Sequence, residues 1–78
     1  MVKAYVLTQI RAGKTGSALV ALKASERVCS AEAVTGLYDI ICVVEAEDIE
    51  GIGRVVMEEI HGVEGIERTL TCVVVGIG

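Results

Sequence analysis

The stretch Ile40-Ile41-Cys42-Val43-Val44 is apolar at every position, and four of its five residues are β-branched. β-branched residues favour strands, and a strand with helices over one face only should alternate apolar and polar side chains. This stretch does not alternate, and neither does Cys72-Val73-Val74-Val75. Both strands therefore need cover on their second face. A second copy of the sheet is the simplest cover, which predicts a homodimer packed sheet to sheet; a sheet that binds a ligand or peptide directly is the alternative.

Outward from this strand, alternating apolar residues predict further strands, and apolar residues at 3.6-residue spacing predict helices. In chain order, the sequence predicts a strand at 2–11, a helix at 15–25, strands at 28–34 and 38–46, a helix at 48–60 and a strand at 66–75. The order β-α-β-β-α-β with right-handed crossovers gives an α+β, ferredoxin-like fold. We expect a four-stranded antiparallel sheet with both helices on one face.

The second helix carries the clearest end signals. Asp48 can accept hydrogen bonds from the free N–H groups of the helix start. Gly51 and Gly53 each cost about 1 kcal/mol relative to alanine, so we expect the first turns to be loose or pressed against another backbone. Gly62 is the predicted stop of the helix, and Gly65 is the predicted turn into the last strand.

Length and charge exclude several classes of protein. Seventy-eight residues allow one domain, predicted over 1–78. The net charge is −4 and no basic run is present, which argues against direct nucleic-acid binding. No apolar stretch approaches the length of a membrane span, and the start of the chain has no signal-peptide pattern. We therefore expect a cytoplasmic protein that does not bind membranes.

Cysteine and histidine, which often bind metals or take part in catalysis, are few in this sequence and lie far apart. Cys29, Cys42 and Cys72 are odd in number and form no CxxC pair, so they indicate neither a zinc site nor a redox motif. We interpret all three as small core residues. The one histidine, His61, lies beside the predicted helix stop and has no partners at metal-ligand spacing. The sequence thus predicts no metal site, no cofactor and no catalytic residue.

The segment from Thr35 to Ile40 is more informative. Gly36 permits a tight turn, and Asp39, three residues later, can point its carboxylate back across that turn. One interpretation is a plain hairpin turn in which Asp39 caps its own backbone. The other is a turn shaped to hold a ligand.

Three sets of residues together carry a resemblance to a known family. They are Gly36-x-Tyr38-Asp39, Asp48 at the start of the second helix, and Gly62-Val63-x-Gly65-Ile66-x-Arg68-Thr69. This arrangement resembles the ligand-binding domain of Lrp/AsnC transcription regulators, the RAM domain, over about Val2 to Val75. The resemblance implies a ferredoxin-like domain that dimerises through its sheets, assembles into octamers or other rings, and binds small amino acids between dimers.

In that family, the turn before the third strand and residues of the fourth strand of a neighbouring subunit hold the amino acid. The resemblance therefore implies that the ligand-binding residues are Thr35, Gly36, Leu37, Tyr38, Asp39, Thr69 and Thr71. Asp39 would pair with the α-ammonium, and the backbone N–H groups of the Gly36 turn would bind the α-carboxylate. Thr69 or Thr71 would hydrogen-bond either group.

The sequence also departs from the family pattern. Full-length regulators carry an N-terminal helix-turn-helix, whereas this sequence begins at the ligand domain, which resembles a stand-alone form. Such a protein would act by co-assembly with a full-length Lrp/AsnC-type regulator or by signalling to another partner. Leu37 is apolar where many relatives have a polar residue, so the amino acid that binds is not fixed by the resemblance.

The sequence favours an amino-acid-sensing, oligomeric module that acts through protein contacts and is not an enzyme. One alternative is a small dimeric enzyme of the monooxygenase or isomerase type. That alternative needs polar and aromatic side chains that converge, and only Tyr5, Tyr38 and His61 are available. Another is a structural adaptor that forms the same oligomer without a ligand.

Overall fold

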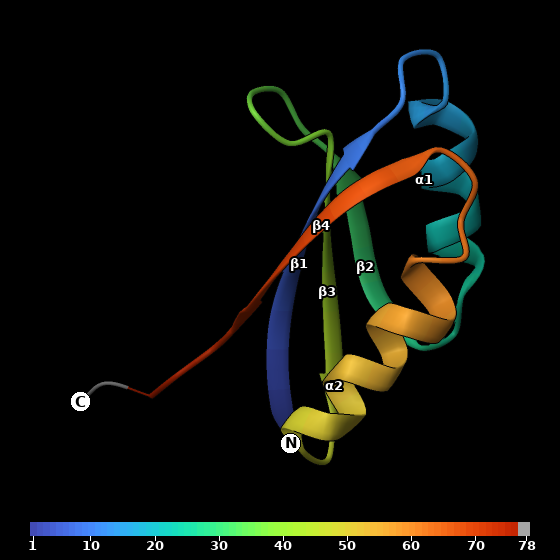
Figure 1. Ribbon diagram of the computed structural model, residues 1–78. Helices are drawn as coiled ribbons and strands as arrows, with labels where there is room; N and C mark the ends of the chain where they lie inside the picture. Colours follow the sequence, from blue (N-terminus) through green and yellow to red (C-terminus); the bar gives the residue numbers. More distant parts are fainter. Residues whose placement is uncertain (77–78) are drawn as a thin grey trace.

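The computed structural model describes residues 1–76, so the last two residues of the predicted domain lie outside the described part. Four strands form one antiparallel sheet, and both helices cover the same face of it (Figure 1). The elements are β1 (Val2–Ile10), α1 (Thr15–Ala24), β2 (Val28–Ala33), β3 (Ile40–Ala46), α2 (Ile49–Val55), the π-helical η1 (Val56–Ile60) and β4 (Ile66–Val73). The predicted β-α-β-β-α-β order and the ferredoxin-like fold are confirmed. No helix within 1–76 combines the length and apolar character needed to cross a membrane.

The strands lie in the order β2-β3-β1-β4, with β1 and β3 in the centre. Thr8 of β1 is opposite Ile40 of β3 on one side and opposite Thr69 of β4 on the other. These three residues therefore form one row across the sheet. The row lies near the end of β1, where the chain between β2 and β3 also passes.

The core lies between the sheet and the helices, and aliphatic side chains fill it. On the sheet side, every second residue of β1 and β3 is buried, as in Val6 and Ile40. On the helix side, Leu22, Ile52 and Ile60 are the largest buried side chains. Each such side chain contributes about 1.5–3 kcal/mol through burial. The one buried polar side chain among residues 1–76 is Thr8, whose hydroxyl donates to the Ile40 carbonyl at 3.0 Å.

The second helix begins as predicted. Asp48 Oδ1 accepts a hydrogen bond from the Gly51 N–H at 2.7 Å. Gly51 is buried against the end of β3, and a Cβ placed on it would lie 2.8 Å from the Ala46 Cβ. Gly51 therefore allows the close approach of α2 to the sheet.

The end of this helix differs from the prediction. Its last turn, η1, is π-helical, and the His61 N–H bonds to the Val56 carbonyl at 2.8 Å. Gly62 does not take the left-handed conformation expected of a glycine stop, whereas Gly65 has φ 98°. The Val63 N–H donates a hydrogen bond to the Ile60 carbonyl, and this bond forms a turn directly after the helix. The glycine in the left-handed conformation, Gly65, therefore lies at the turn into β4 and not at the end of the helix.

The prediction that all three cysteines are core residues is wrong for two of them. Cys42 is fully buried on the helix-facing side of β3, whereas Cys29 and Cys72 are exposed. Cys29 lies where the register between β2 and β3 shifts. Cys72 lies opposite Tyr5, on the face of the sheet that the helices do not cover. Apolar strand patterns alone do not distinguish these positions.

Candidate functional site

The segment between β2 and β3, residues 34–39, is fastened to the end of β1, and we call it the β2–β3 loop. The Asp39 N–H donates to the Thr8 carbonyl at 2.8 Å. The Ile10 N–H donates to Asp39 Oδ2 at 2.7 Å, and Gln9 Nε2 donates to the Leu37 carbonyl at 3.0 Å. These bonds hold the loop in one position beside the sheet.

Within this loop, the predicted ligand-binding residues differ in their exposure to solvent. Gly36 has φ 120°, a left-handed conformation that glycine adopts without strain. Thr35, Gly36 and Leu37 are exposed, and Leu37 is 77% exposed. Tyr38 and Asp39 are half-buried. The Asp39 carboxylate binds the backbone of β1 and not that of its own turn, which differs from the plain-hairpin interpretation.

The two predicted threonines lie on β4. Thr69 pairs with Thr8 and Thr71 pairs with Val6, whose side chains are buried under the helices. Both threonines therefore point to the helix-covered side of the sheet, Thr69 half-buried and Thr71 exposed. Among residues 1–76, no hydrogen bond joins either threonine to the β2–β3 loop. The fold gathers the five loop residues in one place beside the end of β1, whereas the threonines lie on β4, two strands away from β3. Thr69 is opposite Thr8 near that end of β1, and Thr71 is opposite Val6 in the middle of the strand.

The face of the sheet opposite the helices is largely apolar, and we call it the open face. It carries the side chains of Tyr5, Leu7, Ile41, Val43, Leu70 and Cys72. Tyr5 is 39% exposed and Leu70 is 47% exposed. A hollow of about 210 Å³ lies on this face and is lined in part by Tyr5, Ile41 and Val43. The open face thus presents apolar side chains that no segment within residues 1–76 covers.

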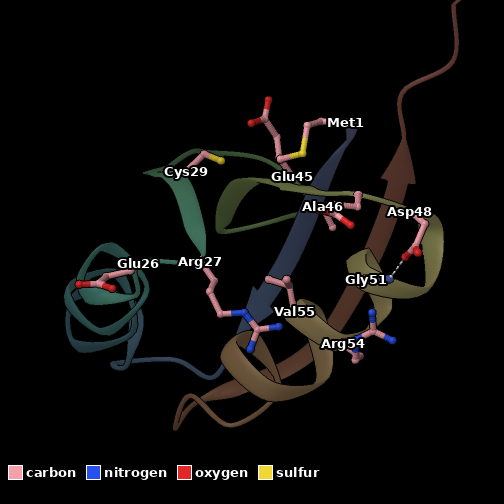
Figure 2. A pocket seen from close by; sticks show the side chains of 11 residues that line it. Met1, Glu26, Arg27, Cys29, Glu45, Ala46, Asp48, Gly51, Arg54 and Val55 are labelled. Carbon is pink, nitrogen blue, oxygen red and sulfur yellow. Dashed lines mark hydrogen bonds between the residues drawn. The ribbon is translucent and has the colours of Figure 1, made fainter.

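A larger hollow of about 410 Å³ lies where β1 begins and β3 ends, at the end of the sheet away from the β2–β3 loop (Figure 2). Asp48 and Arg27, which line it, already have partners within the chain. Asp48 caps α2, and Arg27 Nη1 pairs with Glu58 Oε1 at 2.5 Å. The hydrogen bond to Glu58 raises the pKa of the Arg27 guanidinium. None of the predicted ligand-binding residues lines this hollow, so we do not assign the site to it.

The side chains that an enzyme would need lie apart. Tyr5 is on the open face, Tyr38 is in the β2–β3 loop, and His61 follows η1 on the helix side. Within residues 1–76, no three His, Cys, Asp or Glu side chains are grouped so that they could hold a metal ion. Burial raises the pKa of the Cys42 thiol to about 11, so this thiol is protonated at neutral pH. Tyr5, Tyr38 and His61 therefore do not converge on one site.

Sequence reasoning missed the residues that position the site. Gln9 and the Ile10 N–H anchor the β2–β3 loop, and His61 Nε2 lies 2.9 Å from Thr69 Oγ1. Gln9 is a polar residue near the end of a largely apolar strand, and this was the only feature of the sequence that could have indicated its role as an anchor. The pairing of His61 with Thr69 depends on where the helix end meets β4, which no short pattern encodes.

Comparison with known proteins agrees with this architecture. A family model described as the Lrp/AsnC ligand binding domain matches residues 3–77. The crystal structure of TTHA0845 from Thermus thermophilus is 31% identical with a TM-score of 0.90, over 100% of this chain and 98% of that one. AsnC from E. coli is 25% identical with a TM-score of 0.88, and the match covers 97% of this chain but 52% of AsnC.

A further solved structure shows the fold alone. The transcriptional regulator NMB0573 from Neisseria meningitidis, in complex with L-Met, is 18% identical with a TM-score of 0.81, over 96% of this chain and 50% of that one. No curated protein sequence matches the chain significantly. The fold and the family match together place the chain in a class of small ligand-binding domains with a ferredoxin-like sheet. On the match over residues 3–77, the chain belongs to the Lrp/AsnC ligand-binding domain family.

Proposed function

We propose that this chain is an amino-acid-binding and oligomerising module that modulates the regulation of amino-acid metabolism through protein contacts. The observation that carries the proposal is the anchored β2–β3 loop in a chain of this family. A loop held by Gln9, Ile10 and Thr8 loses little conformational entropy when a ligand binds, which favours affinity. Its exposed Gly36 backbone and Leu37 side chain suit a small molecule with polar and apolar parts.

We propose that the module is a homodimer that packs open face to open face and assembles further into an octamer or a larger ring. Tyr5, Leu7, Ile41, Val43 and Leu70 form the apolar centre of this contact. Contiguous apolar surface of this kind is uncommon on monomers and commonly forms the interface between subunits of a symmetric oligomer. The hollow beside Tyr5 gives side chains of the partner subunit a place to enter.

The amino acid would bind where subunits meet. Within one chain, the loop residues and the threonines are two strands apart, which supports a site completed by Thr69 or Thr71 of a neighbouring subunit. Asp39 Oδ2 is occupied by the Ile10 N–H, so Oδ1 is the oxygen proposed to meet the α-ammonium. The N–H groups around Gly36 are proposed to bind the α-carboxylate.

The proposed role is not enzymatic, and the partners are other proteins. The match of residues 3–77 to the Lrp/AsnC ligand binding domain supports a regulatory role. A full-length Lrp/AsnC-type regulator is the proposed partner, by formation of a mixed assembly through the same open face. The cytoplasm is the proposed location, because such regulators act there.

Thermal shift and light scattering with each proteinogenic L-amino acid at millimolar concentration test this function. Selective binding to the folded state raises the melting temperature by mass action. We expect one or a few amino acids to raise it and to change the size of the assembly. A stable oligomer that responds to no amino acid would contradict sensing and would favour the adaptor. Asp39→Asn, which keeps an acceptor for the Ile10 N–H, should abolish the response while the protein stays folded.

A further inference from the structure

Charged side chains surround the apolar centre of the open face, and among residues 1–76 none of them has an ion-pair partner. On the central strands, Lys3 of β1 is opposite Glu45 of β3. On the edge strands, Glu32 lies on β2 and Arg68 lies on β4. We propose that these charges fix one orientation of the open-face dimer, in which β1 of each subunit lies over β3 of its partner. This inference rests on the proposed function, which includes that dimer.

Strand pairing places the side chains of the open face in rows across the sheet. From β2 to β4, one row consists of Glu32, Ile41, Leu7 and Leu70. Arg68 lies one row from Leu70, toward the end of β1. Lys3 and Glu45 form a row at the start of β1. Lys3 Nζ is 5.2 Å from the centre of the Tyr5 ring, so the Lys3 side chain lies along the open face.

A symmetric dimer of aligned sheets can form in two orientations. Two sheets that pack face to face commonly keep their strands within about 30° of one another, and the two-fold axis of a homodimer lies between them. If that axis is parallel to the strands, β1 lies over the partner's β3 and β2 lies over the partner's β4. If the axis runs across the strands, each strand lies over its own copy.

The charges favour the axis parallel to the strands. In that orientation Lys3 faces the partner's Glu45, and Glu45 faces the partner's Lys3. Glu32 lies over the partner's β4, one row from the partner's Arg68, and long side chains can span sheets about 10 Å apart. The other orientation places Glu32 over the β2 strand of its own copy, so that like charges gather at each edge. Complementary charge across an interface fixes its register.

The shape of the open face supports the same orientation. The hollow of about 210 Å³ is lined by residues of β1, β2 and β3 and by Val34. Leu70 is on β4, outside the hollow, and is 47% exposed. With β4 over the partner's β2, each Leu70 lies over the hollow of the other subunit. With each strand over its own copy, the two hollows lie on one side of the dimer and both Leu70 side chains on the other.

Exchange of the charges at Lys3 and Glu45 tests the orientation. Lys3→Glu makes every charge at that end of the dimer negative, and Glu45→Lys makes every charge there positive. Sedimentation of a dilution series at low salt should give each single variant a dimer Kd at least about tenfold above that of wild type. The double variant restores the alternation of charge, so its Kd should return to within about threefold of wild type.

A mixture of the two single variants gives a second measurement. One variant is labelled with ¹⁵N, both are mixed in urea and refolded together, and native mass spectrometry counts the dimers. We expect more mixed dimer than random pairing gives, whereas wild type with labelled wild type pairs at random. The same exchange at Glu32 and Arg68, both exposed, repeats the test on other strands.

Controls separate this inference from the proposed dimer. Lys23→Glu makes the same change of charge on an exposed residue of α1 and should keep the wild-type Kd. Circular dichroism verifies that each variant is folded. Single variants that dimerise as wild type does, or that pair at random with one another, overturn the orientation and leave the dimer in place. Wild-type protein that sediments as a monomer overturns the proposed dimer and this inference with it.

Discussion

The backbone N–H of Ile10 donates to Asp39 Oδ2 at 2.7 Å, and this bond joins the β2–β3 loop to the end of β1. The register between β1 and β4 shifts at the same place, between Gln9 and Ile10. Asp39 therefore satisfies a backbone donor at an irregular point of the central strand. This structural role is independent of any ligand, and it must be separated from a binding role when Asp39 is substituted.

Substitution of Asp39 tests that structural role. Asp39→Ala leaves the partly buried Ile10 N–H without its partner, which should lower the free energy of unfolding by about 1–3 kcal/mol. Asp39→Asn keeps an acceptor oxygen and should stay within about 0.5 kcal/mol of wild type. Urea denaturation followed by circular dichroism measures both. Equal losses for the two variants would show that the charge of Asp39, and not the hydrogen bond, stabilises the loop.

A lysine on the open face should break the proposed dimer. Leu70 is 47% exposed in the single chain, so Leu70→Lys should leave the fold intact. In a face-to-face dimer, the same ammonium would be buried without a partner, which costs several kcal/mol. We expect light scattering to show a smaller species than wild type at the same concentration. Met57→Lys, on the helix side and 69% exposed, is the matched control and should keep the wild-type mass. A Leu70→Lys protein of wild-type mass would place the interface elsewhere.

Most of the fold could be predicted from local patterns, because each element carries its own signal. Helical spacing located α1, and the Asp48 cap located the start of α2. The apolar stretch at 40–44 correctly indicated a strand with apolar side chains on both faces. These signals lie within a few residues of one another, so they do not depend on how the chain folds.

The site could be predicted only in part, because its geometry depends on contacts between distant residues. The anchors of the β2–β3 loop come from residues about 30 positions earlier in the chain. The π-helical turn leaves no pattern distinct from an ordinary helix end, so the reach of His61 to Thr69 was not foreseen. Cys72 failed as a core prediction for a related reason, since an apolar strand does not show which of its faces the helices cover.

The three thiols should differ in reactivity with Ellman's reagent. Cys42 is fully buried, and burial raises the pKa of its thiol to about 11. At about pH 8 this thiol is protonated, and because the thiolate is the nucleophile it should not react in the folded protein. Cys29 is exposed and should react at once.

Cys72 distinguishes the single chain from the assembly. It is exposed in the single chain but lies on the open face, so the proposed dimer should protect it. Wild type should therefore give one fast thiol per chain, and Leu70→Lys should give two. Mass spectrometry of the labelled peptides identifies which cysteine reacted. Fast labelling of Cys72 in wild-type protein of oligomeric mass would contradict packing through this face.

Two glycines of α2 provide a matched test of how the helix packs on the sheet. A methyl group at Gly51 would lie 2.8 Å from the Ala46 Cβ, whereas one at Gly53 would meet nothing within 4 Å. Gly53→Ala should therefore raise the free energy of unfolding by up to about 1 kcal/mol through helix propensity. Gly51→Ala gains the same propensity, but overpacking costs about 1–3 kcal/mol, so its net effect should be a loss of up to about 2 kcal/mol. Urea denaturation of both variants measures the difference. A stabilising Gly51→Ala would mean that α2 can move away from β3 at little cost, and that Gly51 does not set their separation.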